Sequence, residues 1–410
     1  MGCEHSQSSN MQREKLRIAF ATPEFVTENH FDGGLANYLN RVSQMLAAAG
    51  HDVHVVTLSS TDEEAFEHEG VMVHRVMLKR GWQRLNQLTR YRFTTTLHWL
   101  NLSVQVYRKL KQLHRQTPFH LIQYPNYSSC GVFAIPLLNA THVVRASSYQ
   151  PALNNAGGST RNVDLALTER LELLQYKLTR NAFAPSQAMQ KMLAQEVDLH
   201  DVPVIRTPFY PEAQDCDETI YDQFLKSKEY LLYFGRFQRH KGFHTLVEAL
   251  PRFLNSYPAA YAVLVGRDMA TNGSSMAAWA RARCGSFAER LIILENLPHR
   301  QLYPVIAGAR LVVLPSLIDN LPNTGLEAMG FGKVVIGTKG TSFEELITDG
   351  VDGFLVPPND AGMLAEKTIA AWIDPHLETM SVAAKQRMLD FAPNKTLAPL
   401  LSYYSEVIHQ

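Results

Sequence analysis

Short apolar runs rich in β-branched residues alternate along the chain with longer stretches in which apolar residues recur every three or four positions. Residues 16–21 form the first run, residues 35–46 carry apolar side chains at helical spacing, and a second run follows Gly50 at 53–58. Because short apolar runs are typical of buried strands, this order predicts a strand, a helix and a strand. The other strands expected in the first half cover residues 71–76, 121–123, 141–145 and 182–184.

The alternation fades between about Asp201 and Lys228, where prolines and acidic residues interrupt the periodicity, and then restarts. The strands expected in the second half cover residues 230–234, 261–265, 291–294, 311–314, 334–336 and 354–356. Strands that alternate with helices predict parallel sheets, so the fold class is α/β with two Rossmann-like, doubly wound domains. Such sheets bind ligands at the carboxyl ends of their strands, which predicts a cleft between the two domains.

Chain length, net charge and cysteine content limit the possible classes of protein. A chain of 410 residues exceeds one ordinary hydrophobic core, since domains hold roughly 100–200 residues. The 39 Lys and Arg residues balance the 39 Asp and Glu residues, so no overall field attracts nucleic acid. The four cysteines are scattered and form no CxxC pair, which favours a reducing, cytoplasmic setting over a zinc site or a disulfide framework.

The N-terminal segment 1–14 is expected to be a disordered tail. Its first six residues match the myristoylation pattern MGxxxS, with Gly2 as the acceptor and Cys3 placed for a second acyl chain. So short a pattern also arises by chance, and both interpretations, an acylated N-terminus and an unmodified disordered tail, stay open. No apolar run reaches the roughly 18 residues that span a bilayer.

A loop with two fixed cations follows the strand expected at 230–234. It reads Gly235-Arg236-Phe237-Gln238-Arg239-His240-Lys241-Gly242, and its glycines allow tight backbone turns. The planar donors of Arg236 and the point charge of Lys241 could offset the charge of a diphosphate leaving group. The alternative is that both are solvated residues of a surface turn.

A second loop, after the strand expected at 311–314, carries two carboxylates, Asp319 and Glu327. Pro322 suits the first turn of a helix, and the free amides at 323–325 could face an anion. Carboxylates accept hydrogen bonds from vicinal hydroxyls, so one could hold a ribose and the other a hexose. A helix-capping Asp319 beside an unrelated surface Glu327 is the alternative.

These motifs together resemble a known family. Gly33-Gly34, the loop 235–242, Val265-Gly266, Pro315-Ser316 and the segments 319–329 and 334–358 follow one another as in the retaining GT-B glycosyltransferases of family 4. The resemblance implies the GT-B architecture, in which two Rossmann-like domains face each other across a cleft. It places an acceptor-binding domain at 15–205, a nucleotide-sugar-binding domain at 206–390, and a C-terminal helix at 391–410 that packs back toward the first domain.

The resemblance also implies roles for individual residues. Arg236 and Lys241 correspond to the pair that contacts the donor phosphates, Glu327 to the residue that binds the ribose, and Asp319 to the residue that contacts the donor sugar. Asp319 stands where the family carries glutamate and is one methylene shorter. The remaining donor-binding residues implied are Gly33, Gly34, Gly235, Gly266, Asn320, Leu321, Asn323 and Thr324.

One departure concerns the acceptor side. Many family members carry a histidine just after the strand that corresponds to 141–145, whereas Ser147 stands at that place in this chain. A hydroxyl group cannot hold the positive charge of an imidazolium. Arg145 is the obvious substitute, and a structural ion pair is its alternative role.

The resemblance implies transfer of a sugar from a nucleotide diphosphate sugar, carried by UDP or GDP, to a hydroxyl acceptor with retention of configuration. No further cofactor is implied, and no metal, and the histidines of the sequence show no HExxH spacing. The alternatives are a nucleotide-sugar epimerase of the same architecture and a non-catalytic module that binds nucleotide sugars.

A strongly basic segment covers residues 79–115, with nine Lys or Arg residues and no Asp or Glu. Aromatic residues are interleaved with these charges, at Trp82, Tyr91, Phe93, Trp99 and Tyr107. The segment could hold the protein at the anionic inner face of a membrane, and so reach a lipid-linked acceptor. Solvated helix faces whose aromatics fill the core are the alternative, and nucleic acid is not expected as a partner.

Overall fold

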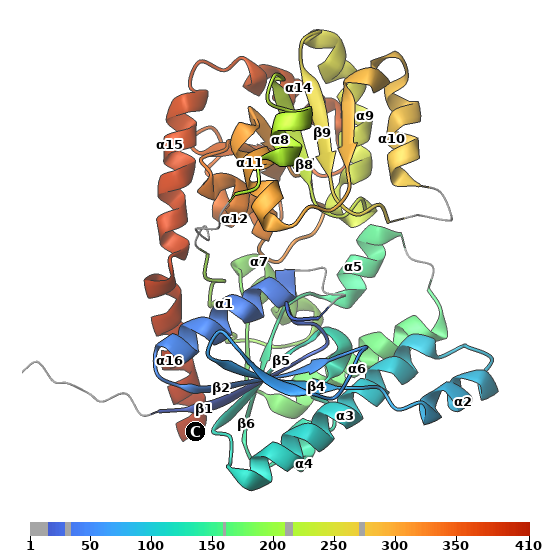
Figure 1. The fold of residues 1–410 in the computed structure, drawn as a ribbon, viewed down its shortest axis with the longest axis vertical. Coiled ribbons are helices and arrows are strands. Elements are labelled where there is room, and N and C mark those ends of the chain that lie inside the picture. Colours follow the sequence, from blue (N-terminus) through green and yellow to red (C-terminus); the bar gives the residue numbers. More distant parts are fainter. Residues whose placement is uncertain (1–14, 29–33, 159–160, 210–215, 270–274) are drawn as a thin grey trace, which may run out of the picture.

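The computed structural model describes residues 15–28, 34–158, 161–209, 216–269 and 275–410. Two α/β domains are stacked along the long axis of the molecule, and Gly33 lies outside the described residues, as do Gly2 and Cys3 (Figure 1). The two domains expected from the alternation of strands and helices are confirmed.

The first domain contains these elements in order: β1 (Arg17–Thr22), α1 (Gly34–Ala48), β2 (Asp52–Leu58), β3 (Ala65–His68), β4 (Val71–Val76), α2 (Gly81–Leu88), α3 (Thr94–Gln116), β5 (Leu121–Pro125), α4 (Ala134–Leu137), β6 (Thr141–Arg145), α5 (Gln150–Gly157), α6 (Val163–Thr179), β7 (Ala182–Phe183) and α7 (Gln187–Glu196). Its sheet has the order β3-β4-β2-β1-β5-β6-β7. All strands are parallel except β3, which runs antiparallel to β4 at the edge.

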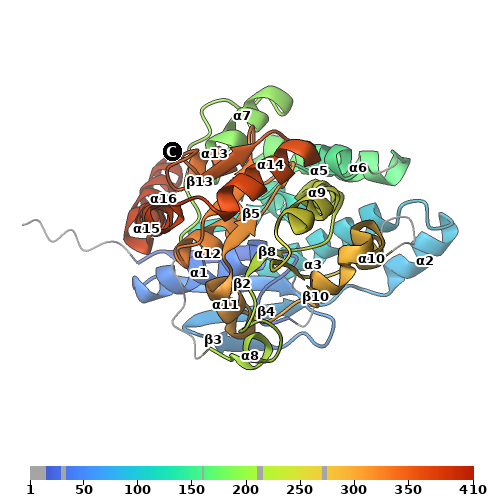
Figure 2. The ribbon, with the colours of Figure 1, turned by 90° about the horizontal axis from the view of Figure 1, so that it is seen from above.

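The second domain contains α8 (Thr219–Phe224), β8 (Tyr230–Phe234), η2 (Arg239–Lys241), α9 (Phe243–Ser256), β9 (Tyr261–Val265), α10 (Met276–Cys284), β10 (Leu291–Leu294), α11 (His299–Gly308), β11 (Leu311–Val313), α12 (Asn323–Gly330), β12 (Val335–Thr338), α13 (Phe343–Leu346), β13 (Gly353–Val356), α14 (Ala361–Trp372) and α15 (Leu377–Arg387). Its sheet is parallel, in the order β10-β9-β8-β11-β12-β13. Seen from above, α9 and α14 lie on one side of this sheet and α11 and α12 on the other (Figure 2).

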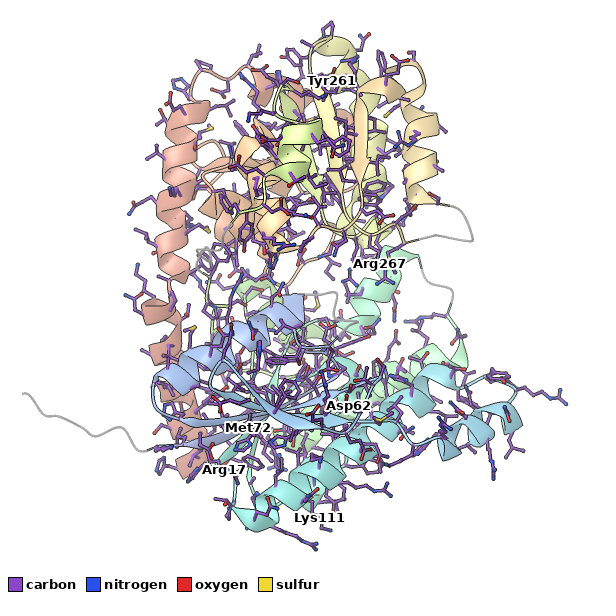
Figure 3. The ribbon with its side chains drawn as sticks, viewed as in Figure 1. Arg17, Asp62, Met72, Lys111, Tyr261 and Arg267 are labelled. Carbon is purple, nitrogen blue, oxygen red and sulfur yellow. The ribbon has the colours of Figure 1, made fainter. Side chains whose placement is uncertain are left out.

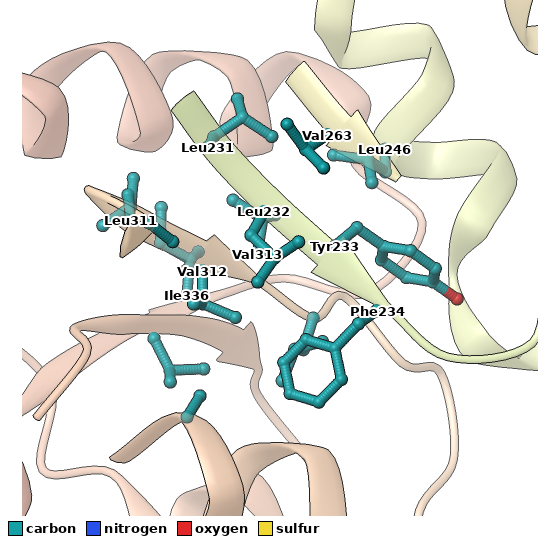
Figure 4. Packing of buried hydrophobic residues seen from close by; sticks show 14 of the residues in the cluster. Leu231, Leu232, Tyr233, Phe234, Leu246, Val263, Leu311, Val312, Val313 and Ile336 are labelled. Atoms are coloured by element: carbon teal, nitrogen blue, oxygen red, sulfur yellow. The ribbon is translucent and has the colours of Figure 1, made fainter. Parts of the chain in front are cut away.

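The central strands of the second domain read as continuous apolar runs because helices cover both faces of the sheet. Every residue of β8 is buried, and Leu232 packs among Val263, Val312 and Leu246 of neighbouring elements (Figure 4). The strands of this core all run in the same direction. Tyr261, at the start of β9, lies far from the first domain, whereas Arg267, just after the end of β9, lies beside it (Figure 3). The carboxyl ends of these strands therefore face the first domain.

The chain crosses between the domains twice. Ile205 belongs to the core of the first domain and Phe209 to that of the second, so the first crossing falls between these two residues. The chain returns through α15 and through α16 (Pro393–His409), which run along one side of both domains (Figure 1). Leu400 and Tyr404 of α16 are buried in the core of the first domain.

None of the helices in the described part of the chain combines the length and the apolar character needed to cross a bilayer.

Candidate active site in the interdomain cleft

Two loops meet at the point where the strand order of the second sheet reverses. The strands β8 and β11 are neighbours in the sheet although three helices and two strands separate them in sequence, and a crevice forms beyond their carboxyl ends. The amide of Leu317 donates to the carbonyl of His240 at 2.9 Å and ties the loops together. Gly242 makes this close approach possible, since a Cβ atom there would lie 1.7 Å from the carbonyl oxygen of Pro315.

Lys241 and Asp319 come from these two loops and form an ion pair. The Nζ atom of Lys241 lies 2.7 Å from Oδ2 of Asp319, with exposed side-chain fractions of 26% and 11%. Arg236 lies half-buried in the same loop, and none of the described carboxylates is within 4.0 Å of its guanidinium group. One of the two cations is thus offset by a carboxylate, whereas the other remains available to an anion.

Two fixed cations act on His240 at this site. Burial, with the charges of Lys241 and Arg236, lowers the pKa of His240 to about 4, so this imidazole stays neutral. The N-terminus of α12 adds partial positive charge, because Pro322 stands before it and none of the described side chains caps its first amides. Thr324 is half-buried in this first turn, and Leu321 is buried just before it. These groups together can bind a phosphate.

Glu327 lies one turn further along α12 and is 4% exposed. Its Oε1 atom is 3.5 Å from Nε2 of His299, the first residue of α11, whose ring stacks on Tyr303. His299 was not singled out from the sequence. Its position near the carboxyl end of β10, where ligands of parallel sheets bind, is the signal that could have found it.

Gly235 and Gly266 lie just after β8 and β9, with φ of 137° and 152°. A Cβ atom at Gly266 would lie 1.9 Å from the carbonyl oxygen of Gly235. Gly266 therefore lets the loops after β8 and β9 pack closely, and Gly235 has a backbone conformation that L side chains rarely adopt.

The first domain approaches this site through α1. The side chain of Asn323 donates from Nδ2 to the carbonyl of Gly34 at 3.3 Å, and a Cβ atom at Gly34 would lie 2.6 Å from that nitrogen. A side chain at Gly34 would therefore displace the side chain of Asn323, the first residue of α12. Asn320 makes a second contact across the cleft, donating from Nδ2 to the carbonyl of Ser147.

Asn126, which follows β5, holds the loop that contains Ser147. Its Oδ1 atom accepts from the amides of Ser147 and Ser148 at 2.6 and 3.1 Å, and its Nδ2 donates to the carbonyl of Ser148 and to Glu172. Burial raises the pKa of Glu172 to about 8. Neither Asn126 nor Glu172 belongs to a recognisable motif, so their role appears only in three dimensions.

Arg145 lies inside the first domain. Its guanidinium group is 3.7 Å from the ring centroid of Tyr38 and donates to the hydroxyl oxygens of Ser147 and Thr207, both at 2.9 Å. Burial lowers the pKa of Arg145. Among the described residues, the partners of this arginine are therefore an aromatic ring and two hydroxyls, not the carboxylate of the ion pair expected as its alternative, and its contact with Ser147 links it to the cleft.

A cavity of about 880 Å³ adjoins the Lys241–Asp319 pair and is lined by both domains. The helices α5, α6 and α7 form one wall, and residues 317–319 and 340–345 form the other. Across it, Glu345 accepts from the amide of Ala188 at 2.9 Å, in the first turn of α7. The cavity is large enough for a sugar-sized molecule beside Asp319.

Comparisons with known proteins agree with this architecture. The family model described as "Glycosyl transferases group 1" matches residues 228–374, and the model described as "Glycosyl transferase 4-like domain" matches residues 33–190. Glycogen synthase of Mycobacterium tuberculosis is 23% identical over 380 residues, which are 87% of this chain and 86% of that protein. D-inositol 3-phosphate glycosyltransferase of Paenarthrobacter aurescens is 24% identical over 92% of this chain and 93% of its own length.

Solved structures share the fold. Sucrose-phosphate synthase from Thermosynechococcus elongatus superposes with a TM-score of 0.74 at 20% identity, over 96% of this chain and all of that one. HepE of Anabaena, in complex with UDP and glucose, gives a TM-score of 0.69 at 19% identity, over 94% of this chain and 99% of that one. Two parallel-sheet domains with facing strand ends define the GT-B architecture, as expected from the sequence. The chain belongs to the group 1 glycosyltransferases, and it is a glycosyltransferase.

Proposed function

We propose that the protein transfers a sugar from a UDP- or GDP-sugar to a hydroxyl acceptor, with retention of anomeric configuration. The observation that carries this proposal is the ion pair between Lys241 and Asp319, which joins two loops beside the N-terminus of α12. The donor diphosphate would bind Arg236, Lys241 and the first amides of α12. Glu327 would then accept hydrogen bonds from the ribose hydroxyls.

The proposed reaction needs no protein nucleophile. The acceptor hydroxyl attacks the anomeric carbon from the face that the diphosphate leaves, and an oxygen of the leaving phosphate takes up the hydroxyl proton. Arg236 and Lys241 stabilise the negative charge that develops on the phosphate, in place of a metal ion. Asp319 orients the sugar through its hydroxyls, and the two domains hold donor and acceptor together.

The acceptor is proposed to enter through the cavity of about 880 Å³, since this cavity reaches Asp319. Its lining is mixed in charge. Arg161, Arg170 and Lys191 stand on the wall of the first domain, and Glu344 and Glu345 stand opposite. A polar acceptor rich in hydroxyl groups suits such a lining.

A thermal-shift screen with UDP-glucose, GDP-mannose and ADP-glucose identifies the donor, because a ligand that binds the folded state raises the unfolding temperature. The solved complex of HepE with UDP and glucose supports a UDP-sugar as the first choice. Release of nucleoside diphosphate during transfer to an acceptor or to water is expected. Isomerisation of the donor without transfer would instead identify an epimerase, and binding without either reaction a non-catalytic module.

Lys241→Ala should lower turnover about 10²- to 10³-fold, the effect of removing one group that stabilises a developing charge. Glu327→Gln should instead weaken donor binding about tenfold or more, because the neutral amide replaces a charged acceptor. Lys226→Ala is the matched control, since Lys226 is exposed and pairs with Asp222 outside the cleft. Circular dichroism checks folding. Near-normal turnover in both folded cleft variants would refute the site assignment.

A further inference from the structure

The helix α2 is amphipathic in sequence, yet none of its residues is buried. Leu88 is 81% exposed and Leu85 is 43% exposed, and Tyr91 in the following turn is 64% exposed. Of the other aromatic residues in the basic segment 79–115, Trp99 is buried, whereas Trp82, Phe93 and Tyr107 are half-buried. The basic segment therefore divides into a packed part on α3 and an exposed apolar part around α2. We refer to residues 80–92 as the α2 tip.

The α2 tip carries four exposed arginines. None of the described carboxylates lies within 4.0 Å of these guanidinium groups, which belong to Arg80, Arg84, Arg90 and Arg92. By contrast, Lys79 just outside the tip pairs with Glu63 at 3.0 Å. Apolar side chains and unpaired cations thus share one small surface.

An acid beside the start of α3, Asp164, is already engaged. Asp164 in the first turn of α6 accepts from the amides of Thr95 and Thr96 at 2.8 Å, and so stabilises the start of α3. The pKa of Asp164 is lowered, with burial opposing the effect of these hydrogen bonds. Its carboxylate is thus hydrogen-bonded to amides of α3 and does not neutralise the arginines of the tip, which keeps its excess of positive charge.

The α2 tip projects sideways from the edge of the first domain, across the axis along which the two domains are stacked (Figures 1 and 2). The helix α6 links it to the interdomain cavity. Arg161 lines the cavity, and three residues later Asp164 contacts the start of α3. A flat surface that contacts the tip would therefore lie near one end of the cavity.

We propose that the α2 tip docks on the surface of an anionic lipid bilayer. Leu85, Leu88 and Tyr91 enter the interface between headgroups and acyl chains, and the arginines bind lipid phosphates. A nucleic acid would engage the cations but would leave the exposed leucines in water. Together with the proposed function, this docking places the cavity beside a lipid-linked acceptor.

Co-sedimentation of the full chain with vesicles tests the docking without any activity measurement, so its failure is distinct from failure of the proposed reaction. The probes are vesicles of phosphatidylglycerol mixed with phosphatidylcholine, and vesicles of phosphatidylcholine alone. Binding to the anionic vesicles is expected, and it should weaken as salt is raised. Absence of binding, or equal binding to both vesicles, would overturn the proposal.

Paired variants test which residues dock. The double variant Arg84→Gln and Arg92→Gln should bind anionic vesicles about twentyfold more weakly, roughly fivefold for each lost charge. Its control is Arg281→Gln with Arg283→Gln, which removes the same charge from exposed positions on α10.

Leu88→Gln should weaken binding about tenfold, since it removes one leucine from the lipid interface. Its control is Val382→Gln, at a residue that is 67% exposed on α15. Equal losses in the tip variants and their controls would refute docking through the tip. Salt-sensitive binding to duplex DNA, unchanged in Leu88→Gln and without vesicle binding, would show a nucleic acid partner in its place.

Discussion

The side chain of Asp319 contacts a cation of the neighbouring loop. A glutamate was expected at this position from the family pattern, and the shorter aspartate stands in its place. The carboxylate nevertheless reaches Lys241 at 2.7 Å, because the two loops pack against each other. Asp319 also precedes α12, which begins only at Asn323, so the eight positions to Glu327 are not one continuous helix.

Glu172 gives a prediction at the scale of one residue. Its folded-state pKa is raised to about 8 by burial, well above the ordinary value of 4.5. A raised pKa means that the folded state favours the neutral form. Its contribution to stability is therefore present below about pH 4.5 and is lost as pH rises through about 8. The loss between these limits is of the order of several kcal/mol.

The variant Glu172→Gln cannot ionise, so it should not share this pH dependence. The unfolding temperature of the natural protein minus that of Glu172→Gln should fall between pH 5 and pH 8, in thermal unfolding followed by circular dichroism. Comparing the two proteins at each pH cancels the titration of other groups. A difference that is the same at both pH values would show that Glu172 does not titrate in this range.

At the scale of elements, the contact between the β8 and β11 loops depends on Gly242. Its φ of 68° lies in the left-handed region, and a Cβ atom would collide with the backbone of Pro315. Gly242→Ala should therefore destabilise the protein by roughly 3 kcal/mol or more and lower turnover, because the loop that carries Lys241 must move.

Gly350→Ala is the matched control for this prediction. Gly350 has a φ of 78°, and a Cβ atom there would meet nothing within 4 Å. Only the left-handed conformation then costs free energy, about 1–2 kcal/mol, and turnover should stay unchanged. Urea unfolding and donor turnover measure both effects. Equal losses of stability in the two variants would show that the loops do not need their close approach.

At the scale of the whole molecule, α16 is late in sequence but belongs to the first domain. Leu400 is 3% exposed in that core, and the hydroxyl of Tyr403 donates to the carbonyl of Ala182 at 3.1 Å. Leu400→Ala should therefore lower the free energy of unfolding by about 2–5 kcal/mol, through loss of buried surface and creation of a cavity. Hydrogen exchange should accelerate in β1 and β5.

Leu389→Ala is the corresponding control, because Leu389 is 52% exposed and its truncation should change stability by less than about 0.5 kcal/mol. Hydrogen exchange followed by mass spectrometry compares the two variants, strand by strand. Faster exchange confined to the second domain in Leu400→Ala would contradict the assignment of α16 to the core of the first.

Much of the fold could be predicted because buried parallel strands leave a strong local pattern. All six strands expected in the second domain are present, with ends that differ by at most two residues. The strand β3 was missed because it is an antiparallel edge strand in which Ala65 and Glu67 are exposed and the other two residues are half-buried. An edge strand lacks the continuous apolar run of a central one.

The sequence by itself determined the two α/β domains, their order, and the loops that carry Arg236, Lys241 and Glu327, because apolar runs and short motifs are local. Only the tertiary structure decided which side chains meet. It brings Lys241 and Asp319, which are 78 positions apart in sequence, into contact. It also buries Arg145 against Tyr38. Asn126, which accepts from the amide of Ser147, is hydrogen-bonded to Glu172. These contacts depend on strand order and on domain packing, and no local pattern of residues encodes them.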